Sequence, residues 1–218
     1  MRVRRIRGTE EALCDYPLFV AEPALLRGTW RRPGFSRLIA EFGGGKGGFI
    51  IEQARRNPDV DYLMVDVVPE ILIRAVKKAS KLDPLPHNLR FARIDLRAAA
   101  EYFADDEFDG LFLNFSDPWP KSGHYKRRLT YREFLAQYSR LLKPGAKLEF
   151  KTDNRKLFEF SLCEFSRAPF VLSFVSLDLH SNEPEDNVRT EYESKFATRG
   201  MPIYKLEAIN AKPSGSCD

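Results

Sequence analysis

The chain has 218 residues, of which 43% are hydrophobic, so it is long enough to bury a core and is not intrinsically disordered as a whole. No stretch approaches the roughly 18 consecutive apolar residues of a membrane span, and the three cysteines form no C-x-x-C pair that would indicate a zinc site or a disulfide framework. The basic N-terminus lacks the apolar segment of a secretory signal, so we expect a cytoplasmic protein that lies in no membrane.

Charge is unevenly distributed along the chain. Lysine and arginine outnumber aspartate and glutamate by only 35 to 31, but residues 118–132 carry five cations and no acid, and residues 1–8 carry four arginines. Residues 183–193 are acidic instead. This pattern predicts a polyanionic partner together with a separate site that uses carboxylates.

From residue 38 onwards, apolar segments alternate with amphipathic ones. Strands are expected at 38–42, 62–67, 88–94, 108–115, 147–151, 170–179 and 203–208, and helices at 49–56, 70–82, 131–142 and 155–167. Such alternation predicts an α/β fold with a mostly parallel sheet covered by helices on both faces. The last two strands follow each other without a strong helix between them, so we expect an antiparallel ending. We expect residues 1–36 to form a basic N-terminal extension, 37–211 the main domain and 212–218 a frayed tail.

A carboxylate lies in or directly after each of five predicted strands. These residues are Glu41, Asp66, Asp95, Asp117 and Asp153. One such acid would most often be a helix cap or a solvated loop residue. Ligands of open parallel sheets bind at the carboxyl ends of the strands, so five acids there predict a ligand site.

The first strand leads into a glycine loop that fits G-x-G-x-x-G through Gly43, Gly45 and Gly48. Asp66 lies near the usual distance for an acid that binds a ribose. This pattern alone does not separate a nicotinamide site from an S-adenosylmethionine site. Glu41 favours the latter, because a carboxylate before the loop would repel a pyrophosphate but accepts an ammonium group or a ribose. Lys46 does not make the loop a P-loop, since the Walker spacing is absent.

The fourth strand is followed by Asp117-Pro-Trp-Pro120 and then by the basic stretch 121–128. The first segment is read as a rigid lip where a planar substrate could stack, with Trp119 as core filler the competing interpretation. The cations of the second could contact phosphates, and Tyr125 could stack or pack. The three histidines have no serine or cysteine partner that would indicate a nucleophilic triad, and no spacing predicts a metal site.

Together these motifs resemble the bacterial tRNA (guanine-N7-)-methyltransferase family over roughly residues 38–204. The motifs are Glu41-Phe-Gly-Gly-Gly-Lys-Gly47, Asn114-Phe-Ser-Asp-Pro-Trp-Pro-Lys121 with His124 and Lys126-Arg-Arg-Leu-Thr130, Phe150-Lys-Thr-Asp-Asn154, and Thr190-Glu-Tyr-Glu193 with Lys195-Phe196. The resemblance implies a Rossmann-like class I methyltransferase fold and transfer of a methyl group from S-adenosylmethionine to N7 of guanine 46 in tRNA.

The resemblance also implies roles for individual residues. Cofactor-binding positions are Glu41, Gly43, Gly45, Asp66, Asp95 and Asp117, and Asp117 is the expected catalytic residue. Substrate-binding positions are Lys121, Asp153, Thr190, Glu191, Tyr192 and Glu193. The RNA-contacting positions are Gly123, His124, Tyr125, Lys126, Arg127 and Arg128.

Two positions depart from the family pattern. Asp66 stands where glutamate is common, and Ser122-Gly123 stands where many members carry Lys-Arg. Two alternatives remain open at this point: a methyltransferase with a small-molecule acceptor, and a non-catalytic RNA-binding module on the same fold. A homo-oligomer is compatible with the sequence but is not indicated by it.

Overall fold

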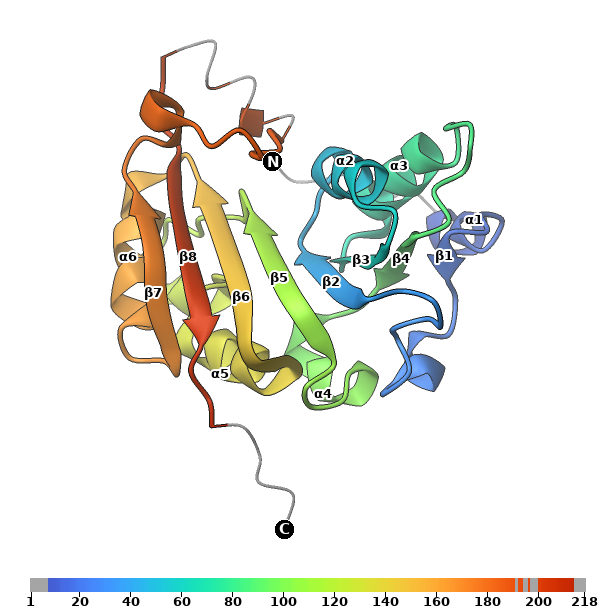
Figure 1. Ribbon diagram of the computed structural model, residues 1–218, viewed down its shortest axis with the longest axis horizontal. Coiled ribbons are helices and arrows are strands. Elements are labelled where there is room, and N and C mark those ends of the chain that lie inside the picture. Colours follow the sequence, from blue (N-terminus) through green and yellow to red (C-terminus); the bar gives the residue numbers. More distant parts are fainter. Residues whose placement is uncertain (1–7, 191, 194–195, 197–199, 214–218) are drawn as a thin grey trace. The chain divides into compact units, whose positions relative to one another are not determined.

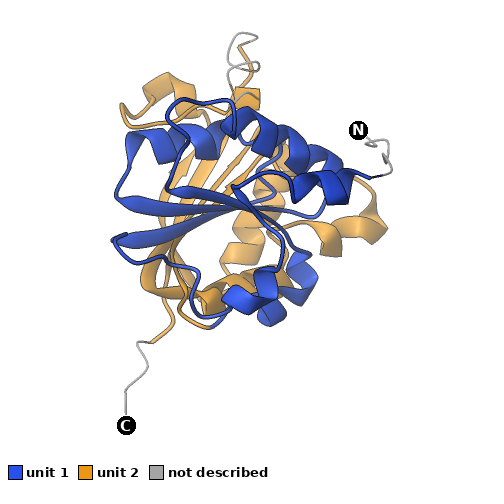
Figure 2. Cartoon of the chain, turned by 90° about the vertical axis from the view of Figure 1, so that its right-hand side faces the viewer, with its two compact units in different colours: residues 1–104 blue, residues 105–218 orange. Residues whose placement is uncertain are grey.

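The computed structural model describes residues 8–190, 192–193, 196 and 200–213 (Figure 1). The chain divides into two compact units, residues 1–104 and residues 105–218, which Figure 2 colours blue and orange. Each unit contains four of the strands together with its own helices, and each is described by itself. None of the helices in the described part has the length and hydropathy that a bilayer crossing needs.

The first unit is built on four parallel strands in the order β1-β4-β3-β2. The strands are β1 (Phe19–Val20), β2 (Arg37–Phe42), β3 (Val60–Asp66) and β4 (Leu89–Arg93). The helices are α1 (Thr9–Leu13), η1 (Pro23–Leu26), α2 (Gly48–Arg56), α3 (Pro69–Ala79), η2 (Leu96–Ala98) and α4 (Ala99–Tyr102). Every residue of β3 before Asp66 is buried, as expected of a parallel strand covered on both faces.

Residues 8–36, which we expected to belong to an extension, are part of this first unit. Strand β1 pairs with β4 through Phe19 and Phe91, and α1 packs against α3. The Trp30 ring is fully buried, lies 5.6 Å from the Phe103 ring, and donates its indole N–H to the Tyr102 carbonyl at 2.9 Å. A two-residue strand carries no periodicity, which is why the sequence gives no sign of it.

The second unit has the strand order β5-β6-β8-β7. Its strands are β5 (Phe108–Asn114), β6 (Leu142–Thr152), β7 (Phe170–Ser176) and β8 (Tyr204–Asn210), and its helices are η3 (Ser122–Arg127), α5 (Arg132–Leu141), α6 (Arg155–Phe165) and η4 (Leu179–Asn182). Strands β5 and β6 are parallel, whereas β8 runs antiparallel to both β6 and β7. The antiparallel ending predicted from the sequence is therefore confirmed.

Strand β6 begins five residues earlier than the predicted strand 147–151, directly at the end of α5. It contains Pro144 and Gly145, the residues expected to separate the helix from the strand. The pairing with β5 shifts register between Phe108 and Gly110, and Gly145 has a φ of 76°. The irregular pairing accommodates a proline that a regular central strand would reject.

Candidate active site

The glycine loop of the first unit lies directly against the Glu41 carboxylate. A Cβ atom added at Gly44 would lie 2.7 Å from Glu41 Oε2 and 2.8 Å from Met64 Cγ, so only glycine fits at that position. Gly47 has a φ of 73°, and a Cβ there would lie 2.8 Å from the Ala75 Cβ. Glu41 is 1% exposed. The loop is thus a tight backbone cradle above a buried acid, a shape that lets a ligand approach the main chain closely.

Asp66 is the last residue of β3, and Asp95 lies two residues after β4. These strands are adjacent and parallel, so the structure brings both acids to the same end of the first unit's strands as Glu41. Asp66 Oδ1 accepts a hydrogen bond from the Val68 amide at 2.9 Å, which orients the carboxylate at the start of α3. Asp95 accepts the Arg97 amide at 3.0 Å and caps η2. A hydrogen bond from the Arg97 side chain lowers the pKa of Asp95. The expected cofactor acids of this unit are therefore grouped, and Asp95 also serves as a helix cap.

In the second unit, Asp117 stands in a loop of unusual backbone conformation. Phe115 has a φ of 51° and Trp119 a φ of 41°, values that side chains with a Cβ rarely adopt. Asp117 lies between these two residues and is exposed. We name residues 117–120 the DPWP lip. Backbone strain of this kind collects at functional sites, where the surrounding structure must hold it.

The basic loop, residues 121–128, folds back onto this lip. His124 meets the Trp119 ring edge-on at 5.8 Å, and the Arg127 guanidinium lies 5.0 Å from the centroid of the same ring. Arg128 donates from Nε to the Pro118 carbonyl at 2.9 Å and from Nη2 to the Trp119 carbonyl at 3.2 Å. Lys126 is exposed. The predicted RNA-contacting segment and the lip thus pack as one piece.

Thr190 and Glu193 form a reciprocal helix cap. The Thr190 hydroxyl accepts the Glu193 amide at 2.9 Å, and Glu193 Oε2 accepts the Thr190 amide at 3.2 Å. This is the capping box, whose signature T-x-x-E could have been read from the sequence. Glu191, also a predicted substrate-binding residue, lies outside the described residues.

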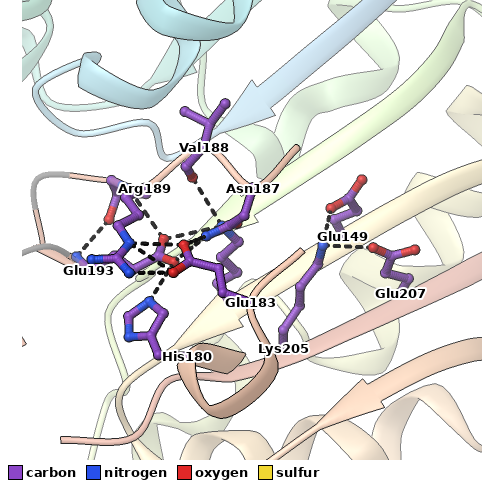
Figure 3. A network of polar contacts seen from close by, with 11 residues as sticks. Glu149, His180, Glu183, Asn187, Val188, Arg189, Glu193, Lys205 and Glu207 are labelled. Atoms are coloured by element: carbon purple, nitrogen blue, oxygen red, sulfur yellow. Dashed lines mark hydrogen bonds and ion pairs between the residues drawn. The ribbon is translucent and has the colours of Figure 1, made fainter. Parts of the chain in front are cut away.

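Glu193 is bound on both carboxylate oxygens by residues that sequence reasoning missed. Oε2 also accepts Lys151 Nζ at 3.1 Å, while Oε1 accepts Asn187 Nδ2 at 2.9 Å and lies 3.0 Å from His180 Nε2 (Figure 3). The Glu193 side chain is fully buried. Burial acts to raise the pKa of Glu193, but the Lys151 charge and these hydrogen bonds outweigh it and hold the pKa below its usual range.

The ammonium group of Lys151 has three acceptors, one for each of its protons. Besides Glu193 it donates to the Asn187 side chain and, at 3.1 Å, to the Val188 carbonyl. Lys151 comes from β6, directly before Thr152 and Asp153. It therefore ties the segment 187–193 to the strand end that carries Asp153.

Tyr192 is an exposed aromatic side chain of this segment, at 58%. Its ring is stacked with that of Phe115 at 6.1 Å and with that of Phe196 at 6.2 Å. Because Phe115 is two residues before Asp117, the structure brings Tyr192 to the loop that carries the expected catalytic residue. Among the described residues, His180, Glu183 and Glu193 place ligand atoms within 4.8 Å of one another, as a metal site would. Arg189 and Lys151 already neutralise the two carboxylates of this cluster.

Comparisons with known proteins agree on one family. A family model described as "Putative methyltransferase" matches residues 36–206. A tRNA (guanine-N(7)-)-methyltransferase of Enterococcus faecalis is 48% identical over 95% of this chain and 98% of its own length. The enzyme of the same name from Streptococcus thermophilus is 44% identical over the same shares.

Solved structures show the fold. The 16S rRNA methyltransferase KamB matches with a TM-score of 0.61 and 14% identity, over 83% of this chain and 91% of its own. A structure described as an antibiotic-related methyltransferase matches with a TM-score of 0.59 and 21% identity, over 81% and 88%. The predicted Rossmann-like class I methyltransferase fold is confirmed.

Proposed function

The chain belongs to the bacterial tRNA (guanine-N7-)-methyltransferase family, and from this we propose that it transfers a methyl group from S-adenosylmethionine to N7 of guanine 46, in the variable loop of tRNA. The observation that carries the proposal is the near full-length match to relatives named for this reaction. We also propose that the enzyme acts in the cytoplasm, because tRNA is its proposed substrate.

The first unit fits the methyl donor. Gly44 lets the loop lie directly against the Glu41 carboxylate, where a side chain would clash, and Glu41, Asp66 and Asp95 lie at the same end of the sheet. The carboxylates would accept hydrogen bonds from the hydroxyl and ammonium groups of the donor. The loop would contact the donor mainly through its own backbone atoms. When bound, S-adenosylmethionine supplies an electrophilic methyl group on a positively charged sulfur.

The second unit carries the groups for the nucleic acid. We assign the guanine to Tyr192, Asp153 and Lys121, since Tyr192 offers an exposed ring and the other two offer charged side chains. Thr190 and Glu193 fix the segment on which Tyr192 stands. Lys126 of the basic loop would contact phosphates.

Guanine N7 carries a lone pair and no proton, so no general base is needed to make it a nucleophile. The chain must place the base, exclude water and stabilise charge. Positive charge builds on the purine as N7 is methylated, which makes its N1 and N2 protons better hydrogen-bond donors. A carboxylate held rigidly beside them binds the transition state better than the ground state, and we assign this role to Asp117.

The proposal is tested by incubating the purified protein with S-adenosylmethionine carrying a labelled methyl group and with bulk tRNA, and by mapping the label with nucleases. We expect label at N7 of guanine 46, with Asp117→Asn as the matched control that retains the fold and loses most of the rate. Label at another nucleotide would refute the assignment of position 46. Binding of tRNA without any incorporation of label would refute the proposed methyl-transfer activity.

A further inference from the structure

The DPWP lip has an unfavourable backbone conformation, so contacts from side chains outside residues 117–120 must stabilise it. Phe115 and Trp119, at φ 51° and 41°, lie on either side of Asp117, and neither is glycine. Asp117 itself is exposed, so its neighbours decide where its carboxylate stands.

Arg128 makes the contacts that such a restraint requires. Its guanidinium donates to the two consecutive carbonyls of Pro118 and Trp119, at 2.9 and 3.2 Å. The same guanidinium lies 4.4 Å from the centroid of the Phe160 ring, on helix α6. The planar guanidinium therefore lies between a helix and the backbone of the lip, and its two hydrogen bonds fix the orientation of the two peptide groups on either side of the Trp119 Cα.

These contacts set Arg128 apart from its neighbour Lys126 in the basic loop. Arg128 is half-buried and directs two of its N–H groups inward, whereas Lys126 is exposed. A side chain that contacts phosphate must offer its charge to the solvent face. Lys126 meets that condition, whereas Arg128 donates its hydrogen bonds to the backbone of the lip.

We infer that Arg128 is a positioning residue for the methyl transfer: it locks the DPWP lip and so holds Asp117 in place, while contributing little to RNA affinity. This inference rests on the proposed function through the role of Asp117. Because Arg127 and His124 also pack on Trp119, RNA bound to the basic loop would reach the lip through the same contacts.

The test uses Arg128→Lys in the full chain, with Arg167→Lys as a matched control at an exposed arginine just after α6. Lysine keeps the charge but has neither the fork nor the planar face. We expect kcat to fall tenfold or more, while KM for tRNA and the slope of log affinity against log salt stay as in the wild type. Lys126→Ala should instead weaken tRNA binding and lower the slope of log affinity against log salt by about 0.7–0.9. The control should change neither.

If Arg128 contacts a phosphate instead, the result should be the opposite. Arg128→Lys would then keep full turnover, and Arg128→Ala would lower the slope of log affinity against log salt. That outcome overturns the inference. If Arg128→Lys folds poorly, Phe160→Leu replaces it, since this removes the stacking partner and leaves the charge; an unchanged kcat there also overturns the inference.

One readout does not depend on methyl transfer at all. The chain has two tryptophans, and Trp30 is fully buried, so acrylamide quenching of the native protein reports mainly on Trp119. Releasing the lip should make Trp119 more accessible and raise the quenching constant in Arg128→Lys but not in Arg167→Lys. Unchanged quenching would refute the restraint even if the proposed function holds, and raised quenching in a protein without activity would support the restraint and refute the function.

Discussion

Replacing Lys151 with methionine should destabilise the protein, because it leaves the carboxylate of Glu193 buried without its counter-charge. Methionine keeps the length of the side chain and none of its donors. Glu193 Oε2 would keep one partner, the Thr190 amide at 3.2 Å. Breaking a buried ion pair by removing one partner costs about 3–5 kcal/mol.

Protonation of Glu193 sets an upper limit on this cost. A carboxyl with an unfolded-state pKa near 4.3 can take up a proton at about 1.4 kcal/mol per pH unit, which at pH 7 limits the ionic part to about 4 kcal/mol. In the wild type the pKa of Glu193 is lowered, so its contribution to stability is present above the unfolded pKa and is lost as the pH falls. In Lys151→Met the folded pKa is raised instead, so the loss of stability should grow as the pH rises from about 4 towards 7.

Urea unfolding followed by circular dichroism at pH 7 and pH 4.5 measures both values. The double variant Lys151→Met with Glu193→Gln is the control, because it removes both charges and should recover most of the loss. A loss under about 1 kcal/mol at pH 7, or an equal loss at both pH values, would show that the carboxylate is not held by Lys151 as the geometry indicates.

Three further predictions concern the reaction. Asp66→Ala should weaken S-adenosylmethionine binding by about 1–3 kcal/mol in calorimetry, through loss of a charge-assisted hydrogen bond to the ribose; wild-type affinity would contradict that contact. Asp117→Asn should lower kcat/KM by about 2–4 kcal/mol in steady-state assays, and near wild-type turnover would exclude the role of Asp117. The wild-type rate should rise with ionisation of a carboxylate between pH 4 and 9, and a dominant inflection near 6.5 would indicate an essential histidine instead.

The larger elements of the fold follow from hydrophobic pattern alone. Strand β3 and helix α3 begin and end within a few residues of the predicted ranges 62–67 and 70–82, because their burial is continuous or periodic. Strand β1 was missed because two residues carry no period. The early start of β6 was missed because Pro144 and Gly145 normally end such elements.

The candidate site, like the fold, is predictable from the sequence only in part. Acids that follow strands, such as Asp66 and Asp95, could be placed from sequence because the end of a strand fixes their location. The partners of Glu193 could not, since Lys151 and His180 lie 42 and 13 residues away and meet it only through the fold. The sequence alone does not separate Arg128 from the other cations of the basic loop, because composition does not show which donors face inward.

The contact between Lys151 and Glu193 also changes the polymer physics of the connection between β7 and β8, residues 177–203. A connection of this length would ordinarily adopt many conformations, and the entropic cost of closing it grows with the logarithm of its length. Anchoring Glu193 to β6 divides it into two shorter spans. Because Lys151 binds the side chains of both Asn187 and Glu193, a single residue added between them should displace one from the ammonium group and weaken the anchor.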